Sequence, residues 1–164
     1  MALHHEPRDY ACPFCRIIRE ANTRSAESDS DSEVVFQSDS VTALLGLGRW
    51  PKNLVDGLIV PNDHFENIYD LPFGPVLDLH RLTRAIALTL KAIYHCEGVS
   101  IRQHNEPAGD QDVWHYHVHV TPRFIGDNFY ASHKIKFPED ERLHHARRLR
   151  EYLRTQRVEL AVEP

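Results

Sequence analysis

The sequence predicts an α+β fold in which a mainly antiparallel sheet carries a long helix packed on it and a C-terminal helix. Three observations support this prediction: short apolar runs between residues 33 and 61, a long amphipathic stretch at 75–94, and two alternating runs at 99–104 and 113–122 that flank a turn. Runs of strands with helices laid against one face are typical of α+β proteins. At 164 residues, 41% of them hydrophobic, the chain is long enough for one domain with a substantial core.

The N-terminal part of the chain combines polar segments with a short helix. Residues 1–9 are polar, and we expect them to form a flexible leader ahead of a single domain over residues 10–164. The segment Phe14–Glu20 predicts a short helix. Ser, Asp and Glu dominate residues 22–33, which contain almost no apolar side chains, so we expect an exposed loop there.

Three strands are expected next. Two of them, Glu33–Gln37 and Val41–Leu45, are separated by a Ser-Asp-Ser turn. A loop rich in Gly, Trp and Pro covers residues 46–53. The third strand spans Leu54–Pro61, and its alternation is interrupted at Asp56-Gly57.

The second half of the chain predicts two helices around a hairpin. Spacings of three and four residues place one apolar stripe on the helix at 75–94, and its members are Leu79, Leu82, Ile86, Leu90 and Ile93. Gly98 is expected to stop this helix. Strands at 99–104 and 113–122 then form an antiparallel hairpin. A last helix at 138–157 opens with Pro and three acidic residues, and its arginines come later, which complements the helix dipole.

Composition and charge exclude several classes of protein. No apolar run approaches 18 residues, and the N-terminus lacks a basic segment followed by an apolar one. We therefore expect no membrane association and a cytoplasmic location. A formal net charge of −5 argues against broad binding to nucleic acid. Three cysteines in such a chain do not indicate a disulfide framework.

Three histidines, His115, His117 and His119, occupy every second position of an apolar and aromatic run between Trp114 and Arg123. Alternation is the period of a β-strand, so we expect all three imidazoles on one face, about 6.6–6.8 Å apart. Such a row suits a metal ion, or one nucleophilic imidazole between two others that handle charge and protons. The row is the first candidate site.

Cys12 and Cys15 form a Cys-x-x-Cys pair near the N-terminus. This spacing lets two thiolates converge on one ion, but it also suits a redox pair or no special role. A structural zinc site needs four ligands, so two imidazoles would have to come from elsewhere in the chain. Cys96, near the end of the long helix, is expected to be a small apolar residue.

Several segments resemble the histidine triad (HIT) superfamily. The run His-Tyr-His-Val-His-Val, which begins at His115, is similar to the family signature His-φ-His-φ-His-φ-φ, where φ is apolar. The likeness extends to Cys12-Pro-Phe-Cys15, to Leu58–Asn67 and to Pro122-Arg123, and it covers roughly residues 10–125. The resemblance implies the HIT fold, usually a homodimer in which two sheets join, and a nucleotide or nucleotide conjugate as substrate.

The resemblance also implies a structural Zn²⁺ ion. Family members with Cys-x-x-Cys complete a zinc site with a His that follows the Ile-Pro segment and with the first His of the triad. In this chain the implied ligands are Cys12, Cys15, His64 and His115. A ligand role largely withdraws His115 from proton transfer and makes it structural.

The chemistry implied by the resemblance centres on His117. This residue would attack the α-phosphorus of a nucleotide and form a nucleotidyl-histidine, which water then hydrolyses. His119 would sit beside the phosphate oxygens and stabilise developing charge. The expected enzyme is a hydrolase or nucleotidyltransferase acting on nucleoside phosphoramidates or dinucleoside polyphosphates.

Four further residues are expected to contact the substrate or to fix the loop around it: His104, Asn105, Gln111 and Asp112. The first three fit a role as turn residues equally well. Gly46 stands where many family members have an Asp that binds the ribose, and Asp112 stands where Ser or Thr often contacts the phosphate. An ionised Asp112 would repel an anion unless it points away or pairs with a cation, for which Arg102 and Arg123 are candidates.

Two other functions stay open at this point. A nucleotide-binding sensor or interaction module could have kept the fold without useful turnover, although the intact His117 favours an enzyme. Alternatively, all three strand histidines could hold a catalytic ion with an open coordination position, giving a metal-hydroxide hydrolase. Metal stoichiometry and the detection of a covalent adduct would separate these functions.

Overall fold

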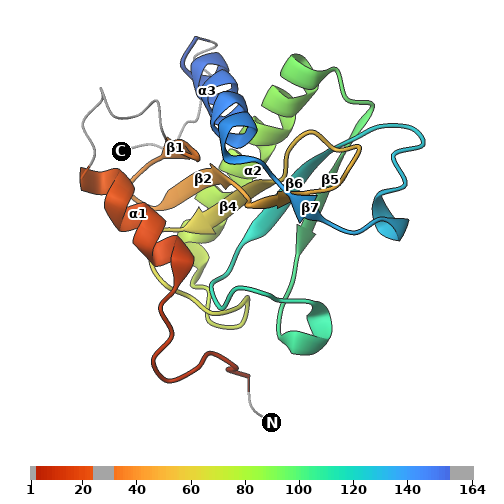
Figure 1. The fold of residues 1–164 in the computed structure, drawn as a ribbon. Helices are drawn as coiled ribbons and strands as arrows, with labels where there is room; N and C mark the ends of the chain where they lie inside the picture. Colours follow the sequence, from red (N-terminus) through yellow and green to blue (C-terminus); the bar gives the residue numbers. More distant parts are fainter. Residues whose placement is uncertain (1–2, 24–31, 156–164) are drawn as a thin grey trace.

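Five antiparallel strands form the central sheet of the computed structural model, which describes residues 3–23 and 32–155 (Figure 1). Their order across the sheet is β1-β2-β4-β6-β5, and each neighbouring pair is antiparallel. The strands are β1 (Val34–Gln37), β2 (Val41–Leu45), β4 (Gly57–Pro61), β5 (Gly98–Gln103) and β6 (Val118–Arg123). Together with the helices, this sheet confirms the predicted α+β fold.

Helices lie on both faces of the sheet (Figure 1). The larger apolar core joins α2 and α3 to one face, and a smaller one joins α1 to the opposite face. The helices are α1 (Pro13–Thr23), α2 (Phe73–Tyr94) and α3 (Glu139–Thr155). Two short strands, β3 (Gly48–Arg49) and β7 (Ile135–Lys136), pair in an antiparallel ribbon. Two 3₁₀ turns are η2 (Pro107–Gly109) and η3 (Phe129–Ala131). In the part of the chain that the structure describes, none of the helices is long and apolar enough to cross a membrane.

Alternation along β6 separates the core from the histidines. Val118 and Val120 are buried in the core beneath α2. His119 points to the other face, where it pairs across the ladder with Leu58 of β4, a residue packed in the α1 core. Opposed residues of an antiparallel pair share a face. The histidine face of the sheet is therefore the face that α1 covers.

The helix α2 is the predicted long helix, and its apolar stripe is buried as expected. The stripe residues at most 3% exposed are Leu79, Leu82, Ile86 and Leu90, while Ile93 is partly buried. The predicted end of the helix at Tyr94 is confirmed, but the residue that caps it is His95 and not Gly98, which begins β5. His95 adopts a left-handed backbone conformation (φ 51°), and its N–H donates to the Lys91 carbonyl at 3.1 Å, which closes the helix.

The strand that leads out of the histidine row is shorter than predicted. The sequence predicts a strand over 113–122, but the ladder with β4 and β5 begins at Val118. Ahead of it, the backbone N–H of His115 donates to the Val113 carbonyl at 2.8 Å, so this donor is satisfied outside the ladder. The first two histidines of the row therefore lie on an irregular approach segment.

Other boundaries differ by a few residues. β4 begins at Gly57 instead of Leu54, after the interruption that the sequence shows. α1 continues to Thr23, and residues 24–31 of the predicted exposed loop lie outside the described residues. The C-terminal helix spans 139–155, and the last residues predicted for it also lie outside them.

Asp127 fixes the loop that follows β6. Its buried carboxylate accepts hydrogen bonds from Arg123 Nε at 2.6 Å and Nη2 at 2.8 Å, from the Asn53 amide at 2.8 Å, and from the backbone N–H groups of Phe124 and Phe129 at 3.1 Å. These bonds, led by those from Arg123, hold the pKa of Asp127 well below its usual range. The charged carboxylate thus ties two loops to the end of β6.

Replacing Asp127 with Ala should destabilise the fold by about 3 kcal/mol at neutral pH, because removing one partner of a buried ion pair leaves the other uncompensated. Chemical denaturation measures this difference. The depressed pKa means that the contribution is present above the unfolded carboxyl pKa of about 3.9 and is lost as the pH falls below it. The difference from the parent should therefore shrink on acidification, and equal stability at pH 7 would contradict the assignment.

Candidate functional site

His117 is almost completely buried, with 2% of its surface exposed. Its Nδ1 lies 2.8 Å from the carbonyl oxygen of His115. A carbonyl oxygen only accepts, so Nδ1 carries the proton and Nε2 keeps a free lone pair. Burial lowers the pKa of His117 to about 4, so the ring is neutral at neutral pH. The side chain thus offers an uncharged, nucleophilic nitrogen.

His119 is the next imidazole, and its ring centre lies 4.9 Å from that of His117. Its Nδ1 lies 3.0 Å from Oδ2 of Asp56, a fully buried carboxylate that also contacts the Lys134 ammonium at 3.0 Å and accepts from the Thr121 hydroxyl at 2.9 Å. Burial alone would raise the pKa of Asp56, but His119 and Lys134 hold it below its usual value. The ionised carboxylate fixes the Nδ1–H of His119 and leaves its Nε2 for a substrate.

His104, one of the predicted binding residues, lies beside this pair. Its ring stands edge-on to His119, with 5.6 Å between ring centres. Its Nδ1 donates to the Gly109 carbonyl at 2.7 Å, which fixes the tautomer and leaves Nε2 available. The structure therefore brings His104 to the end of the histidine row.

Asp112 lies in front of the row with its side chain 72% exposed. One of its carboxylate oxygens is 3.7 Å from Nε2 of His117. Neither Arg102 nor Arg123, the two cations considered for it, is within ion-pair distance of Asp112 in the described residues. The exposed carboxylate is free to turn into solvent.

Asn105 and Gln111 hold the turn that precedes the row. Gln111 is buried, its amide donates to the carbonyls of Glu66 and Val113, and its oxygen accepts from the backbone N–H of Glu106. The side-chain oxygen of Asn105 accepts from the backbone N–H of Ile68 at 2.9 Å. These bonds shape the loops, so the structure brings both residues near the row without placing them against it.

The four predicted metal ligands, Cys12, Cys15, His64 and His115, come together in one cluster. Their ligand atoms all lie within 4.8 Å of one another. Sγ of Cys12 is 3.3 Å from Nδ1 of His115, and Sγ of Cys15 is 3.2 Å from Nδ1 of His64. Two sulfurs and two imidazole nitrogens at these separations fit a tetrahedral zinc site with bonds of about 2.3 and 2.0 Å.

Neighbouring groups turn the correct nitrogens toward this cluster. Nε2 of His115 donates to the Pro61 carbonyl at 3.0 Å, and Nε2 of His64 lies 2.6 Å from the Glu6 carboxylate. Each ring therefore presents the lone pair of Nδ1 to the cysteines. Burial and the adjacent Cys12 raise the pKa of Cys15 to about 12, so two thiolates at this place require a cation between them.

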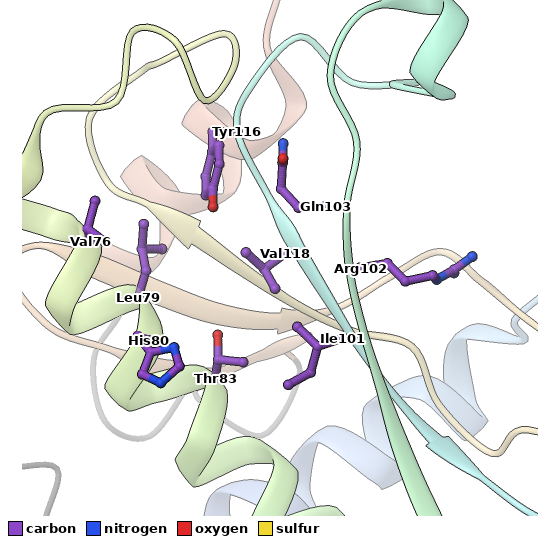
Figure 2. Close-up of a pocket in the computed structure, with 9 residues that line it drawn as sticks. All are labelled: Val76, Leu79, His80, Thr83, Ile101, Arg102, Gln103, Tyr116 and Val118. Atoms are coloured by element: carbon purple, nitrogen blue, oxygen red, sulfur yellow. The ribbon is translucent and has the colours of Figure 1, made fainter.

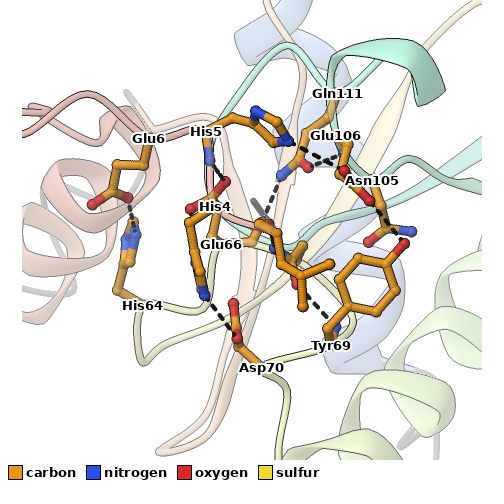
Figure 3. A network of polar contacts seen from close by, with 12 residues as sticks. His4, His5, Glu6, His64, Glu66, Tyr69, Asp70, Asn105, Glu106 and Gln111 are labelled. Atoms are coloured by element: carbon orange, nitrogen blue, oxygen red, sulfur yellow. Dashed lines mark hydrogen bonds and ion pairs between the residues drawn. The ribbon is translucent and has the colours of Figure 1, made fainter. Parts of the chain in front are cut away.

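Polar N-terminal residues lie over the loops around the cluster (Figure 3). The contacts are His4 with Glu66 at 3.1 Å and Asp70 at 3.5 Å, His5 with Glu106 at 3.2 Å, and Glu6 with His64 at 2.6 Å. Residues 4–6 of the predicted leader are thus connected to the metal cluster and to the turn before the histidine row.

Three residues at the site, Asp56, Lys134 and Glu6, were not predicted from the sequence. A signal for Asp56 was present, since a carboxylate that interrupts a buried apolar strand needs a partner inside the fold. Lys134 and Glu6 lie in irregular segments whose local sequence has no periodic pattern. Only the tertiary fold brings them to Asp56 and His64.

A family model described as HIT domain matches residues 27–126. Among related sequences, Protein hit of Bacillus subtilis is 28% identical over 124 residues, which cover 75% of this chain and 79% of that protein.

Two solved structures illustrate the likeness of the fold. A Zn-bound histidine triad family protein from Mycobacterium smegmatis has a TM-score of 0.71 and 22% identity, and the match covers 90% of this chain and 96% of that one. The diadenosine triphosphate hydrolase of Plasmodium falciparum, in complex with Cyclomarin A, has a TM-score of 0.66 and 15% identity over 87% of this chain and 97% of that one.

Proposed function

This chain belongs to the HIT domain family, and we propose that it is a nucleotide hydrolase or nucleotidyltransferase that cleaves at the α-phosphate through a nucleotidyl-His117 intermediate. The observation that carries the proposal is the buried, neutral His117, whose Nδ1–H is held by a backbone carbonyl and whose Nε2 is free. A diadenosine triphosphate hydrolase of the same fold supports dinucleoside polyphosphates as a substrate class, beside nucleoside phosphoramidates.

The reaction has two displacements at phosphorus. The Nε2 lone pair of His117 attacks the α-phosphorus, a P–N bond forms, and the leaving group departs with the electron pair of its bond and takes a proton from solvent. The Nδ1–H bond to the His115 carbonyl stabilises the positive charge that the ring acquires. Water then displaces His117, the P–N bond breaks, one proton returns to solvent, and the nucleoside monophosphate is released.

His119 supports this chemistry through Asp56. The Asp56 carboxylate, 3.0 Å from Nδ1, fixes the ring of His119, and in the proposed mechanism its Nε2 faces the phosphate oxygens. A donor placed where negative charge develops lowers the barrier. Asp56 is thus a positioning residue for His119.

Asp56→Asn should lower kcat/KM by about 10- to 100-fold, since loss of one positioned donor costs about 100- to 1000-fold and this change leaves the His119 ring in place. Steady-state kinetics of folded, zinc-loaded protein measures the effect. Thr121→Val is the matched control, because it removes only the 2.9 Å hydroxyl bond to the same carboxylate, and it should keep most of the activity. Parental kcat/KM in Asp56→Asn would remove Asp56 from the mechanism.

Of the two predicted substrate contacts nearest the row, His104 and Asp112, we propose that His104 contacts the phosphate. His104 can donate or accept at the phosphate through Nε2, while Asn105 and Gln111 shape the loop that carries it. The exposed Asp112 turns away when an anion approaches His117, because like charges at about 4 Å repel by about 1 kcal/mol even in water. Gly46 offers no carboxylate to the ribose, so ribose contacts come from other groups.

A structural Zn²⁺ ion on Cys12, Cys15, His64 and His115 is part of the proposal. The two-sulfur, two-nitrogen donor set and a Zn-bound protein of the same fold support it. A closed set of four ligands leaves no position for water, so the ion's contribution is to hold the N-terminal segment against the sheet. His117 and His119 lie outside this cluster, which does not favour a metal-hydroxide mechanism on the three histidines.

We further propose a homodimer formed through β5 and α2. β5 lies at the edge of the sheet and exposes Ile101, and the start of α2 exposes Phe73, Val76 and Leu77. Figure 2 shows the hollow between α2 and the β5–β6 pair that Val76 and Ile101 help to line. An open strand edge beside apolar side chains is typical of a self-association surface, and analytical ultracentrifugation tests for it.

Trapping the covalent intermediate tests the proposed function directly. Rapid, acid-free quenching with adenosine and guanosine phosphoramidates and dinucleotides should give a mass increase of one nucleotidyl group on the peptide that contains His117. Nucleotide binding without an adduct and without turnover would favour the sensor function instead.

A further inference from the structure

The histidine face of the sheet also carries a cluster of cations and aromatic rings that the proposed mechanism does not use. The guanidinium of Arg102 lies 4.6 Å from the ring centres of both Trp50 and Phe129. The ammonium of Lys134 lies 4.7 Å from the ring centre of Trp50. Two cations therefore share one aromatic support.

Strand register places Arg102 beside the catalytic histidines. In the ladder between β5 and β6, Arg102 is the direct partner of His119. Directly opposed residues project to the same face with Cβ atoms about 4.5–5.5 Å apart. Figure 2 shows Arg102 extending to the opposite side of β5 from Ile101, away from the hollow beneath α2.

Lys134 reaches the same place through Asp56. The Asp56 carboxylate contacts both His119 and Lys134 at 3.0 Å, so it bridges the imidazole and the ammonium. The Lys134 side chain is still 37% exposed. Its ammonium has three donors and can bind a ligand anion while it stays paired with Asp56.

Arg102 carries a charge without a carboxylate partner. Within residues 3–23 and 32–155, it makes no hydrogen bond or ion pair, and its buried Nε is unpartnered. Arg123, which follows His119 on β6 and lies on the same face, instead donates from its guanidinium to the Asp127 carboxylate. A guanidinium stacked on aromatic rings with its donors unused is a preorganised site for a phosphate or sulfate group.

The geometry points to an anion subsite, formed by Arg102 and Lys134 next to His119, that binds a phosphate or sulfate group joined to the α-phosphate of the substrate. The inference rests on the proposed function and narrows its substrate class. The leaving group is anionic, and the substrate is a nucleotide anhydride instead of a phosphoramidate with a neutral amine. Both cations stabilise the electron pair that stays on the leaving oxygen when the bond to phosphorus breaks.

The test compares substrates that differ in the charge of the leaving group. Zinc-loaded parent protein and Arg102→Gln are assayed with diadenosine triphosphate, adenylyl sulfate and adenosine phosphoramidate. Arg102→Gln should lower kcat/KM at least tenfold for an anhydride and less than about threefold for the phosphoramidate. The ratio between the two anhydrides shows whether phosphate or sulfate is preferred. Arg102→Lys keeps the charge but loses the stacked guanidinium, so it should retain only part of the preference.

Arg147→Gln is the matched control. Arg147 is exposed on α3, which packs on the other face of the sheet. Its replacement changes the net charge by the same amount but should leave kcat/KM unchanged for all three substrates. An equal loss for all three substrates in Arg102→Gln, or a parental preference for the phosphoramidate, would overturn the subsite. The first outcome would mean that Arg102 only supports Trp50.

Binding of inorganic pyrophosphate and sulfate, measured by calorimetry, separates the subsite from the proposed function. If the parent turns over none of the substrates, the proposed function fails. The subsite is then still supported if pyrophosphate or sulfate binds to the parent at least tenfold more tightly than it binds to Arg102→Gln. Equal affinities of the two proteins for these anions would exclude the subsite.

Discussion

Replacing His117 with Ala is expected to abolish turnover, with kcat/KM falling by about four orders of magnitude or more, as when other enzymes lose a covalent nucleophile. No neighbouring imidazole offers a replacement. The free Nδ1 of His115 faces the cysteines, and His119 is held at Nδ1 by Asp56. The measurement is steady-state turnover in zinc-replete protein freed of contaminating phosphatases.

His119→Ala is the comparison for this variant. It should be slower than the parent but measurable, because charge stabilisation is lost while the attacking atom stays. Both variants should keep the parental melting temperature and zinc content. Near-parental turnover of His117→Ala would contradict the nucleotidyl-histidine mechanism and move the metal-hydroxide alternative to first place.

Joint replacement of Cys12 and Cys15 by Ala should lower the melting temperature by about 10 °C, which corresponds to about 3 kcal/mol in a domain of this size. The four ligands come from the start of α1, the loop after β4 and the approach to β6. The proposed ion would therefore join segments far apart in the chain. Activity per folded molecule should fall less than stability does.

Metal analysis and X-ray absorption complete this test. The parent should hold about one zinc per chain with two sulfur ligands. Cys96→Ala is the control, since Cys96 is buried in the α2 core and should leave the zinc content unchanged. Only nitrogen and oxygen around the metal, or no metal in carefully prepared parent protein, would exclude the site.

The sequence predicted those parts of the molecule that depend on local periodicity. The apolar stripe of α2 and the short apolar run at Val41–Leu45 required no knowledge of distant residues, and both elements are where the pattern placed them. The meeting of Cys12, Cys15, His64 and His115 was implied by family resemblance, because spacing alone left the cysteine pair open between metal, redox and no role.

Long-range contacts were beyond the sequence. The strand prediction at 113–122 failed at its start because the backbone near His115 finds its hydrogen bonds outside the ladder. Asp56 directly precedes β4 and Lys134 directly precedes β7, and only the tertiary fold brings the two side chains together. A period-two or period-3.6 pattern carries no information about such meetings.

The Cys12, Cys15, His64 and His115 cluster has a consequence for the synthesis of the chain on the ribosome. Cys15 and His115 are 100 residues apart in the sequence. At synthesis rates of about 5–20 residues per second, about 5–20 s pass between the synthesis of Cys15 and that of His115. During that time the proposed zinc site lacks its fourth ligand and α1 lacks much of the sheet face it covers, so we expect the two thiols to be most accessible to oxidants while the protein is being synthesised.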